Sequence, residues 1–401
     1  MSNCQNYDLI VIGGGPLGLS TAFHGARRGL KTLVLEQFGL FNNLGSSAGN
    51  SRQFRLQYAE QYMSELTIAS LSFWAQLQSY TQETLVSRNG SLWFGDPSLS
   101  SQEGGIEAAE KVMDTLNIAY TKFTASEIEQ QFGFQNLPPD YRGFFQADGG
   151  IINFKATEQA LFNASLATKR VDFNEWETVT GIDSVEGKGV TITTDKAVYN
   201  GAKLAITTGP YINNTMALLG LSVPIDIWQM SSSYFRKTNS ELQLPTWFVF
   251  QKPQETALFY GFPEVDWSFP GYLRVATDFP DDGKILTNPD QRVLAPSSES
   301  LRLDSEWVRD HMTGLDPTPR FTSTCLIALA KDSSKELLLD YVPDTIPNHQ
   351  NIVVLTAGWA AKFVPILGDM ICDMFESDQA DFNYGKYQIP RSNFAIDWQQ
   401  Q

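Results

Sequence analysis

The fold is decided by residues 7–36, which begin YDLIVIGGGPLG and end TLVLE. A short apolar run that glycines terminate is typical of a buried parallel strand. Gly13, Gly15 and Gly18 have the GxGxxG spacing: the first permits a tight turn, the second lets the backbone approach a pyrophosphate, and the third lets helix and strand pack closely. Pro16 and Leu17 lie within this glycine stretch, and a helix-like run follows it to Arg28. This order of strand, glycine turn and helix predicts a dinucleotide-binding unit.

The second strand of this unit ends in an acidic residue. Residues 33–35 are Leu-Val-Leu, and Glu36 follows the glycines by roughly 20 residues, as the motif requires. A carboxylate there accepts hydrogen bonds from a ribose diol and disfavours a 2′-phosphate. The helix N-terminus, with roughly half a positive charge, favours the pyrophosphate. The alternative is a glycine turn with no ligand, which the combined spacing of strand, helix and acid disfavours.

Composition excludes several classes of partner. The chain has 401 residues and a formal net charge of −16, so a nucleic acid or an anionic membrane is an unsuitable partner. We find no apolar run of the ~18 residues that a bilayer span requires. Cys4, Cys325 and Cys372 have neither a metal-ligand spacing nor a disulfide framework, which fits a reducing compartment. The first strand begins too early to leave room for a signal peptide, and we expect a cytoplasmic protein without a metal site.

The length predicts two domains, and the pattern of the chain changes near residue 221. Residues 221–321 are rich in Trp, Phe, Tyr and Pro and alternate apolar with polar positions, which indicates a mixed or antiparallel sheet. A place in the core is the simpler interpretation of any single Tyr or Trp there, and a substrate pocket is the alternative. We expect an α/β fold with a discontinuous, Rossmann-like nucleotide-binding domain at 1–85, 151–222 and 323–390. The segments 86–150 and 223–322 would form an α+β substrate domain.

The hydrophobic pattern also predicts individual elements. Helices are expected at 62–80, 105–116, 126–132, 156–169 and 365–375. The third of these helices would begin with a capping box of Ser126 and Glu129. Short buried strands are expected at 202–209 and 351–357, each ending in a turn of small residues. Hairpins are expected at 85–94, turning at Asn89-Gly90, and at 179–198, turning at 187–189.

Two further segments carry candidate site residues. The loop GSSAGNSRQFRLQY at 45–58 is rich in small residues that let a backbone approach a flat group. Arg52 and Arg55 are three apart, so on one helical turn they would face the same side; a pair of surface arginines is the alternative. Gly358 ends the strand expected at 351–357, and Lys362 follows it before the last helix. A surface position is the alternative for this lysine.

These motifs together resemble the flavin-dependent amine oxidases of the sarcosine oxidase and N-methyltryptophan oxidase group, within the D-amino acid oxidase superfamily. The resemblance runs along nearly the whole chain. It rests on the unit at 7–36, the loop at 45–55, the Tyr-Gly-Phe-Pro segment at 260–263, Cys325, and the Ala-Gly-Trp-Ala-Ala-Lys segment at 357–362. It implies bound FAD and an FAD-binding domain of the glutathione reductase type.

The resemblance also implies roles for single residues. Cys325 matches the cysteine that the family joins covalently to the flavin 8-methyl group; a buried free thiol is the alternative. Arg52 matches the arginine that lies against the flavin ring. Arg55 and Lys362 match the pair that grips the substrate carboxylate, which a guanidinium fork fits bidentately. Arg274 stands where the family has a lysine that promotes reaction of the reduced flavin with oxygen, and an arginine keeps the charge but cannot release a proton.

The complete set of expected site residues joins these matches to the dinucleotide unit. The residues expected at the reaction centre are Arg52, Arg55, Tyr260, Arg274, Trp359 and Lys362. The residues expected to bind FAD are Gly13, Gly15, Pro16, Leu17, Gly18, Glu36, Gln37, Ser46, Ser51, Arg52, Val179, Thr208, Gly209, Cys325, Gly358, Trp359 and Lys362. Ala48 and Ile327 stand where sarcosine oxidase has a histidine and a tyrosine, which argues against sarcosine itself as the substrate.

We expect the protein to oxidise the carbon–nitrogen bond of an amino acid or N-substituted amino acid to an imine, with oxygen as acceptor and hydrogen peroxide as product. One alternative is a flavin dehydrogenase or desaturase of a biosynthetic pathway that uses another acceptor. A flavin-binding protein without turnover is a second alternative, which the paired cations argue against. His24, His311 and His349 are expected to be structural or exposed. The expected partner is a small amino acid with a carboxylate, and the protein is expected as a monomer or a small homo-oligomer.

Overall fold

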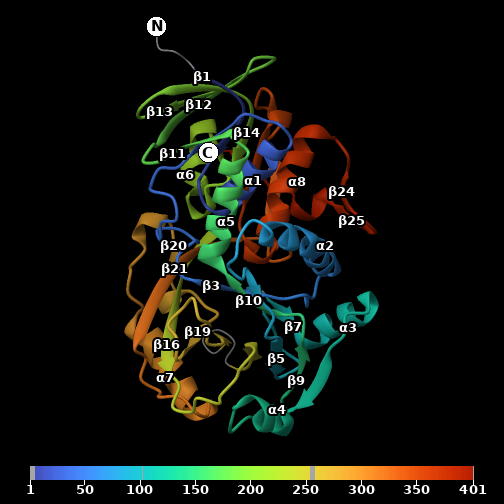
Figure 1. The fold of residues 1–401 in the computed structure, drawn as a ribbon, viewed down its shortest axis with the longest axis vertical. Helices are drawn as coiled ribbons and strands as arrows, with labels where there is room; N and C mark the ends of the chain where they lie inside the picture. Colours follow the sequence, from blue (N-terminus) through green and yellow to red (C-terminus); the bar gives the residue numbers. More distant parts are fainter. Residues whose placement is uncertain (1–4, 102, 253–257, 401) are drawn as a thin grey trace.

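The computed structural model describes residues 5–101, 103–252 and 258–400. Two large sheets stand one above the other in Figure 1, and a small sheet that includes β3 and β10 lies between them. The upper part combines the blue N-terminal segment with the red C-terminal segment, so it is assembled from distant stretches of the chain, as the sequence predicts. Within the described residues, no helix has both the length and the apolar character that a membrane span needs.

The upper sheet is built around β1 (Gln5–Ile12). Its eight strands have the order β11-β2-β1-β14-β13-β12, with β23 beside β14 and β22 beside β23. The strands β11, β2, β1, β14 and β23 run parallel, and their apolar residues are buried, as a sheet covered by helices requires. The expected hairpin at 179–198 is confirmed as β12 and β13. The other strands are β2 Thr32–Leu35, β11 Val171–Asn174, β12 Val179–Val185, β13 Gly189–Thr194, β14 Val198–Ile206, β22 Leu338–Tyr341 and β23 Ile352–Thr356.

Four helices accompany this sheet: α1 (Pro16–Arg27), α2 (Gln61–Gln78), α5 (Phe154–Ala167) and α8 (Val364–Glu376). The first of them, α1, contacts both α5 and α8. The approach of α1 and α8 is close, because a Cβ atom added at Gly368 would lie 2.3 Å from the backbone of Ser20. The helix that follows the glycine turn is therefore fixed directly against the last long helix of the chain.

The lower sheet has nine strands in the order β20-β16-β19-β18-β17-β5-β9-β8, and β21 also pairs with β16. It is mainly antiparallel, with a parallel pairing of β5 and β17, so the expected mixed sheet is confirmed. The strands are β5 Ser91–Gly95, β8 Thr121–Thr124, β9 Arg142–Gln146, β16 Ile225–Arg236, β17 Thr246–Phe250, β18 Phe259–Phe262, β19 Tyr272–Thr277, β20 Ile285–Leu286 and β21 Phe321–Ala330. The helices α3 Ile106–Leu116, α4 Ala125–Phe132 and α7 Ser298–His311 belong to this part of the chain.

The small sheet has the order β3-β10-β4, with β3 at Ser51–Phe54, β4 at Val86–Ser87 and β10 at Gly150–Asn153. It brings together residues near the expected domain boundaries at 85 and 150. One expected boundary differs from the strand pairing, since β21 pairs with β16 from Phe321 to Ala330 and thus belongs to the lower sheet beyond residue 323. The remaining boundaries stay a prediction.

Three local expectations are wrong. Residues 85–94 are not a hairpin, because β4 pairs with β10 whereas β5 pairs with β9 and β17. The capping box of α4 uses Thr124 and Glu127 instead of Ser126 and Glu129, two residues earlier. The arginine-bearing stretch 51–54 is the strand β3 and not a helical turn. The five expected helices are confirmed with shifts of one or two residues at most of their ends.

Several short elements complete the chain. They are α6 Ile212–Met216, β6 Ser100–Ser101, β7 Gly104–Gly105, β15 Leu221–Ser222, β24 Asp381–Tyr384, β25 Tyr387–Pro390 and β26 Gln399–Gln400, together with short 3-10 turns. One of these turns, η6 (Ala360–Phe363), directly precedes α8 and carries Lys362.

Candidate functional site

A cavity of about 380 Å³ is lined by residues of both large sheets. On the upper side it is bounded by the carboxyl ends of parallel strands, where open α/β sheets bind their ligands. On the lower side it is bounded by residues of β16 to β21, including Met230, Phe248 and Ile327. Every expected site residue lines this cavity apart from Gly18, Ser51 and Arg55. The sequence patterns therefore identified residues of one cavity from segments more than three hundred positions apart, Gly13 and Lys362 among them.

The glycine turn has the geometry of a phosphate cradle. Gly13 has φ +102°, which side-chain-bearing residues rarely adopt, and a Cβ atom at Gly18 would lie 1.8 Å from the carbonyl oxygen of Gly13. A Cβ atom at Gly15 would meet only Ser47 Oγ, at 3.7 Å, so this position faces the cavity. Among the described residues no side chain caps α1, and its first N–H groups are available to an anion.

The acid at the end of β2 is preorganised. Glu36 is buried and accepts hydrogen bonds from the backbone N–H of Gly14 at 2.7 Å and of Phe38 at 2.9 Å. Burial raises the pKa of its carboxyl, and these N–H donors oppose that rise. The neighbouring cavity wall contains Gln37, Val179, Thr208 and Gly209. The arrangement suits the ribose end of a dinucleotide.

Arg52 ties the glycine-rich loop to β3. Its guanidinium donates to the carbonyl oxygens of Ser46, Ala48 and Ser51 at 2.5–2.8 Å and lies 4.7 Å from the centre of the Phe154 ring. Ser51 lies just behind the cavity wall, and its hydroxyl accepts a hydrogen bond from Trp267 Nε1 at 3.2 Å. The loop at 45–58 was expected to lie against a flat group. Arg52, which the resemblance assigns to the same place, holds this loop in shape.

The lower wall carries a second buried guanidinium. Arg274 donates to Ser232 Oγ at 2.9 Å, to the Ser51 carbonyl at 3.3 Å and to the hydroxyl of Tyr260 at 3.0 Å. Burial raises the pKa of Tyr260, so the phenol stays protonated. Cys325, a free thiol on β21, is half-buried and also lines the cavity. These groups place positive charge and a thiol on one side of the cavity.

Lys362 supplies the cation on the other side. It is buried, its ammonium lies 5.5 Å from the centre of the Tyr58 ring, and its backbone carbonyl accepts a hydrogen bond from Trp74 Nε1 at 2.8 Å. Burial, and next the neighbouring Arg55 cation, lower the pKa of the Lys362 ammonium. The turn before it is tight, since a Cβ atom at Gly358 would lie 1.4 Å from a backbone oxygen of Glu336. Lys362 is therefore not a surface lysine.

Arg55 does not line the cavity, contrary to the expectation from a helical turn. Arg52 lies in β3 and Arg55 directly follows the end of this strand at Phe54, where an extended chain turns positions three apart to opposite faces. Arg55 is fully buried between the rings of Tyr58 and Trp93, 4.4 and 4.9 Å from their centres, and its charge pairs with Glu103. The expected grip of Arg55 on a carboxylate is not preformed in this structure.

Buried carboxyl groups near Lys362 were missed by the sequence analysis. Glu103 and Asp278 line the cavity, and Glu336 lies within electrostatic reach of both Arg55 and Lys362. Burial and then Glu103 raise the pKa of Asp278 and of Glu336. Asp278 had a signal, because positions 274, 276 and 278 fall on one face of a strand. Glu103 comes from a separate loop, and no pattern in the sequence marked it.

The glycine cradle, the uncapped helix and the acid of β2 fit a dinucleotide, and the cavity beyond them fits the ring that such a cofactor carries. A family described as FAD-dependent oxidoreductases matches residues 8–374. The chain belongs to this family. The protein is thus an FAD-dependent oxidoreductase, and the resemblance inferred from the sequence is confirmed.

Individual members of the family are similar to nearly the whole chain. A putative bifunctional amine oxidase of Dictyostelium discoideum is 31% identical over 98% of this chain, which spans only 38% of that protein. The peroxisomal sarcosine oxidase of Homo sapiens is 25% identical, and the match covers 96% of each chain. The solved structure of NikD, described as an unusual amino acid oxidase essential for nikkomycin biosynthesis, is 35% identical with a TM-score of 0.90, and the match covers 99% of each chain.

Proposed function

We propose that the protein oxidises the carbon–nitrogen bond of an amino acid or N-substituted amino acid to an imine. The observation that carries this proposal is Lys362, a buried cation in the wall of the cavity that the FAD-binding cradle opens into. FAD, when bound, supplies the acceptor for the hydride equivalent of that bond. The activities named for the human sarcosine oxidase and for NikD fall in the same substrate class.

Lys362 would bind the substrate carboxylate. Before the substrate binds, burial disfavours the charged form of Lys362. An arriving carboxylate favours the charged form, because opposite charges at hydrogen-bond distance stabilise each other. Arg55 would strengthen the positive potential from behind the wall, and it would touch the substrate only after its pair with Glu103 opens. An amine without a carboxylate would gain neither contribution, so the site would select amino acids.

The acids beside Lys362 would hold protons for the reaction. Because burial raises the pKa of Asp278 and Glu336, these groups are neutral more often than exposed carboxyls. A neutral Asp278 leaves the charge of Lys362 available to the substrate. A deprotonated carboxyl in the same place could instead take the proton of a substrate ammonium, whose neutral amine form is the one that loses hydride.

Oxygen is the acceptor we propose, and Arg274 would supply positive charge where oxygen is reduced to hydrogen peroxide. One observation favours a second candidate, a dehydrogenase or desaturase with another acceptor. The guanidinium of Arg274 is engaged by Ser232, Ser51 and Tyr260, and it has no proton to release at neutral pH. Peroxide formation compared with dye reduction separates the two candidates.

We also propose that Cys325 forms a covalent bond to FAD: the thiol would lose its proton and the flavin 8-methyl group a hydrogen, and the two electrons released would pass through the flavin to oxygen. Its thiol lines the cavity on β21, beside Ile327 and opposite Met230 on β16. Acid precipitation of the holoprotein tests this proposal, because a covalent flavin leaves the yellow colour in the pellet and Cys325→Ser moves it to the supernatant. A colourless wild-type pellet contradicts it. A cytoplasmic location and a monomer or small homo-oligomer complete the proposal.

An anaerobic reduction screen tests the function. The holoprotein is mixed with amino acids and N-alkylated amino acids, and the flavin absorbance is followed. We expect at least one carboxylate-bearing amine to bleach the flavin, while its decarboxylated counterpart bleaches it far more slowly. Equal bleaching by both members of each pair would contradict the proposed carboxylate selection, and no bleaching by any amine would contradict the function itself.

A further inference from the structure

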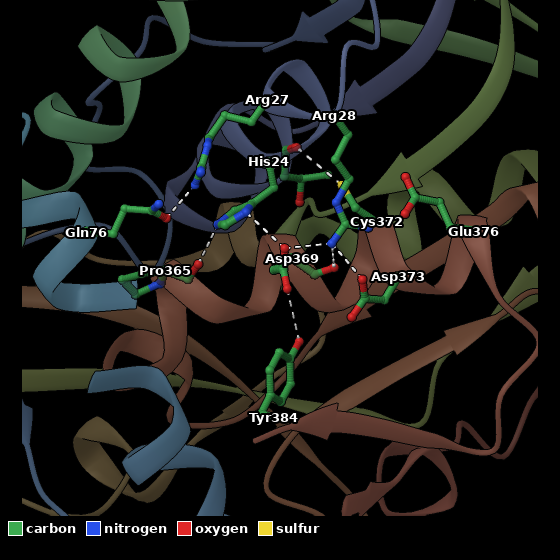
Figure 2. A network of polar contacts seen from close by, with 11 residues as sticks. His24, Arg27, Arg28, Gln76, Pro365, Asp369, Cys372, Asp373, Glu376 and Tyr384 are labelled. Carbon is green, nitrogen blue, oxygen red and sulfur yellow. Dashed lines mark hydrogen bonds and ion pairs between the residues drawn. The ribbon is translucent and has the colours of Figure 1, made fainter. Parts of the chain in front are cut away.

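His24 joins the two helices that approach the FAD and substrate sites. It lies in α1 and is buried, with 4% of its surface exposed. Its Nε2 atom lies 2.8 Å from the carbonyl oxygen of Pro365, and its Nδ1 atom lies 3.2 Å from Oδ1 of Asp369. Both partners belong to α8, and Figure 2 shows the imidazole between them.

The two contacts of His24 require the same protonation state. A carbonyl oxygen and a carboxylate oxygen are both acceptors, and a neutral imidazole has only one N–H to donate. Only the imidazolium form donates from both ring nitrogens at once. The geometry therefore fits a positively charged His24.

The charges around His24 support this state. Arg28 pairs with Asp369 and Asp373 at 2.6 Å and with Glu376 at 2.9 Å, so one guanidinium faces three carboxylates. Burial raises the pKa of Asp369, but hydrogen bonds and charges from His24 and Arg28 outweigh it and hold that pKa below its ordinary value. A second cation at position 24 brings the charges of this network closer to balance.

Two further neighbours of the network, Tyr384 and Cys372, are neutral. The hydroxyl of Tyr384, on β24, lies 3.4 Å from Oδ2 of Asp369, and Cys372 lies against the carbonyl of Thr21 with a pKa that burial raises to about 12. Arg27, a further cation of this turn, donates to Gln76 on α2 (Figure 2). The rings of Phe23 and Phe73 cover His24 at 5.1 and 5.7 Å.

The contacts of His24 with α8 link the helix of the FAD-binding cradle to the helix that follows Lys362, so they bear on the geometry of the site. The N-terminus of α1 is the FAD cradle, and Pro365 stands three residues after Lys362 at the start of α8. Gly368 packs directly on Ser20, so the two helices have little freedom to slide. A contact that fixes the Pro365 carbonyl to α1 thereby fixes the turn that carries Lys362 relative to the cradle.

We propose that His24 is a positioning residue: as an imidazolium it bridges Pro365 and Asp369 and sets the place of Lys362 relative to bound FAD. The proposal rests on the proposed role of Lys362 in holding the substrate carboxylate. From the sequence, His24 was expected to be structural or exposed, because its partners lie some 340 positions further along the chain.

Nitrogen NMR of the holoprotein tests the protonation state without any activity. The chain has 3 histidines, so ¹⁵N-histidine labelling gives a small set of signals, and His24→Gln assigns one of them. We expect both ring nitrogens of His24 to show the protonated type at neutral pH. A neutral-tautomer pattern for this residue would overturn the proposal. His311→Gln is the matched control, since His311 lies at the end of α7, whose contacts are with β16 and β19 of the lower sheet.

Kinetics test the positioning role. We expect His24→Gln to raise the KM for the amino acid substrate by about tenfold, equivalent to ~1.4 kcal/mol, with a much smaller change in kcat. The same substitution in a Lys362→Met background should leave KM unchanged, because the residue through which His24 acts is absent. Equal effects in both backgrounds would show a general structural role and refute the proposal. Should His24→Gln not fold, Asp369→Asn removes one of the two acceptors and is expected to raise KM in the same direction.

The outcomes separate this proposal from the proposed function. If Lys362→Met alone leaves KM unchanged, the carboxylate role of Lys362 is wrong, and the NMR result still decides the charge of His24. If Lys362→Met raises KM but His24→Gln does not, the function stands and the positioning role is refuted.

Discussion

Replacement of Lys362 by methionine should weaken substrate binding without weakening the fold. Methionine keeps the unbranched stem that fills the buried space and removes the ammonium. A hydrogen bond to a charged group contributes about 1.5–3 kcal/mol. At ~1.4 kcal/mol per tenfold change, we expect the dissociation constant of the amino acid to rise by about 10- to 150-fold.

The stability of the apoprotein should respond in the opposite direction. Burial and the Arg55 cation lower the pKa of Lys362 in the folded state, so its charge opposes folding at every pH below the unfolded value. Glu103, Glu336 and Asp278 offset part of this cost. We therefore expect the melting temperature of the Lys362→Met apoprotein to equal or exceed that of the wild type.

Anaerobic titration of the flavin absorbance gives the dissociation constant, and differential scanning calorimetry of the apoprotein gives the melting temperature. Lys331→Met is the matched control, because that ammonium is 60% exposed and only 4.0 Å from a single carboxylate. An unchanged dissociation constant in Lys362→Met would refute the role of this cation. A large drop in melting temperature would refute the reasoning that its charge is unfavourable in the empty site.

Three further perturbations test other parts of the account. Glu103→Gln leaves the fully buried Arg55 without its partner and should lower the free energy of unfolding by about 3–5 kcal/mol in denaturant titrations; an unchanged stability would contradict the buried pair. Gly18→Ala should abolish FAD binding, measured by quenching of flavin fluorescence, because the new Cβ would lie 1.8 Å from the Gly13 carbonyl; Gly181→Ala, where the added Cβ would meet only the Thr193 side chain at 3.4 Å, is the control. Substrate binding should take up protons, because the substrate carboxylate favours the charged form of Lys362, whose pKa is lowered to about 7 before the substrate binds. The affinity for the substrate should therefore be greatest below that pKa and should fall as the pH rises through it. Calorimetry in buffers of different ionisation enthalpy measures the uptake, and proton release would contradict the sign.

The upper half of the molecule could be predicted because its determinants are local in sequence. The GxGxxG spacing fixes a turn in which Gly18 lies directly against the carbonyl of Gly13, and Glu36 follows within the same unit. The same holds for the hairpin of β12 and β13, which a short turn closes. In such segments the pattern of a few neighbouring residues determines both the structure and the ligand.

The substrate side could be predicted only in part, because distant segments build it. The spacing of Arg52 and Arg55 suits a helical turn, but pairing with β10 makes the segment a strand and turns Arg55 away from the cavity. Its partner Glu103 arrives from a loop that no motif marks. Asp278 could have been found from the two-residue period of β19, because it directly follows this strand and continues the alternation that includes Arg274.

The central claim is that the cavity selects an anionic amine through Lys362 beside bound FAD. The most direct measurement is the ratio of anaerobic flavin-reduction rates for an N-alkylated amino acid and for the same amine without its carboxylate. The account predicts a ratio of at least about tenfold in the wild type, which corresponds to ~1.4 kcal/mol, and a ratio near one in Lys362→Met. A wild-type ratio near one, or a ratio that survives the loss of Lys362, would contradict it.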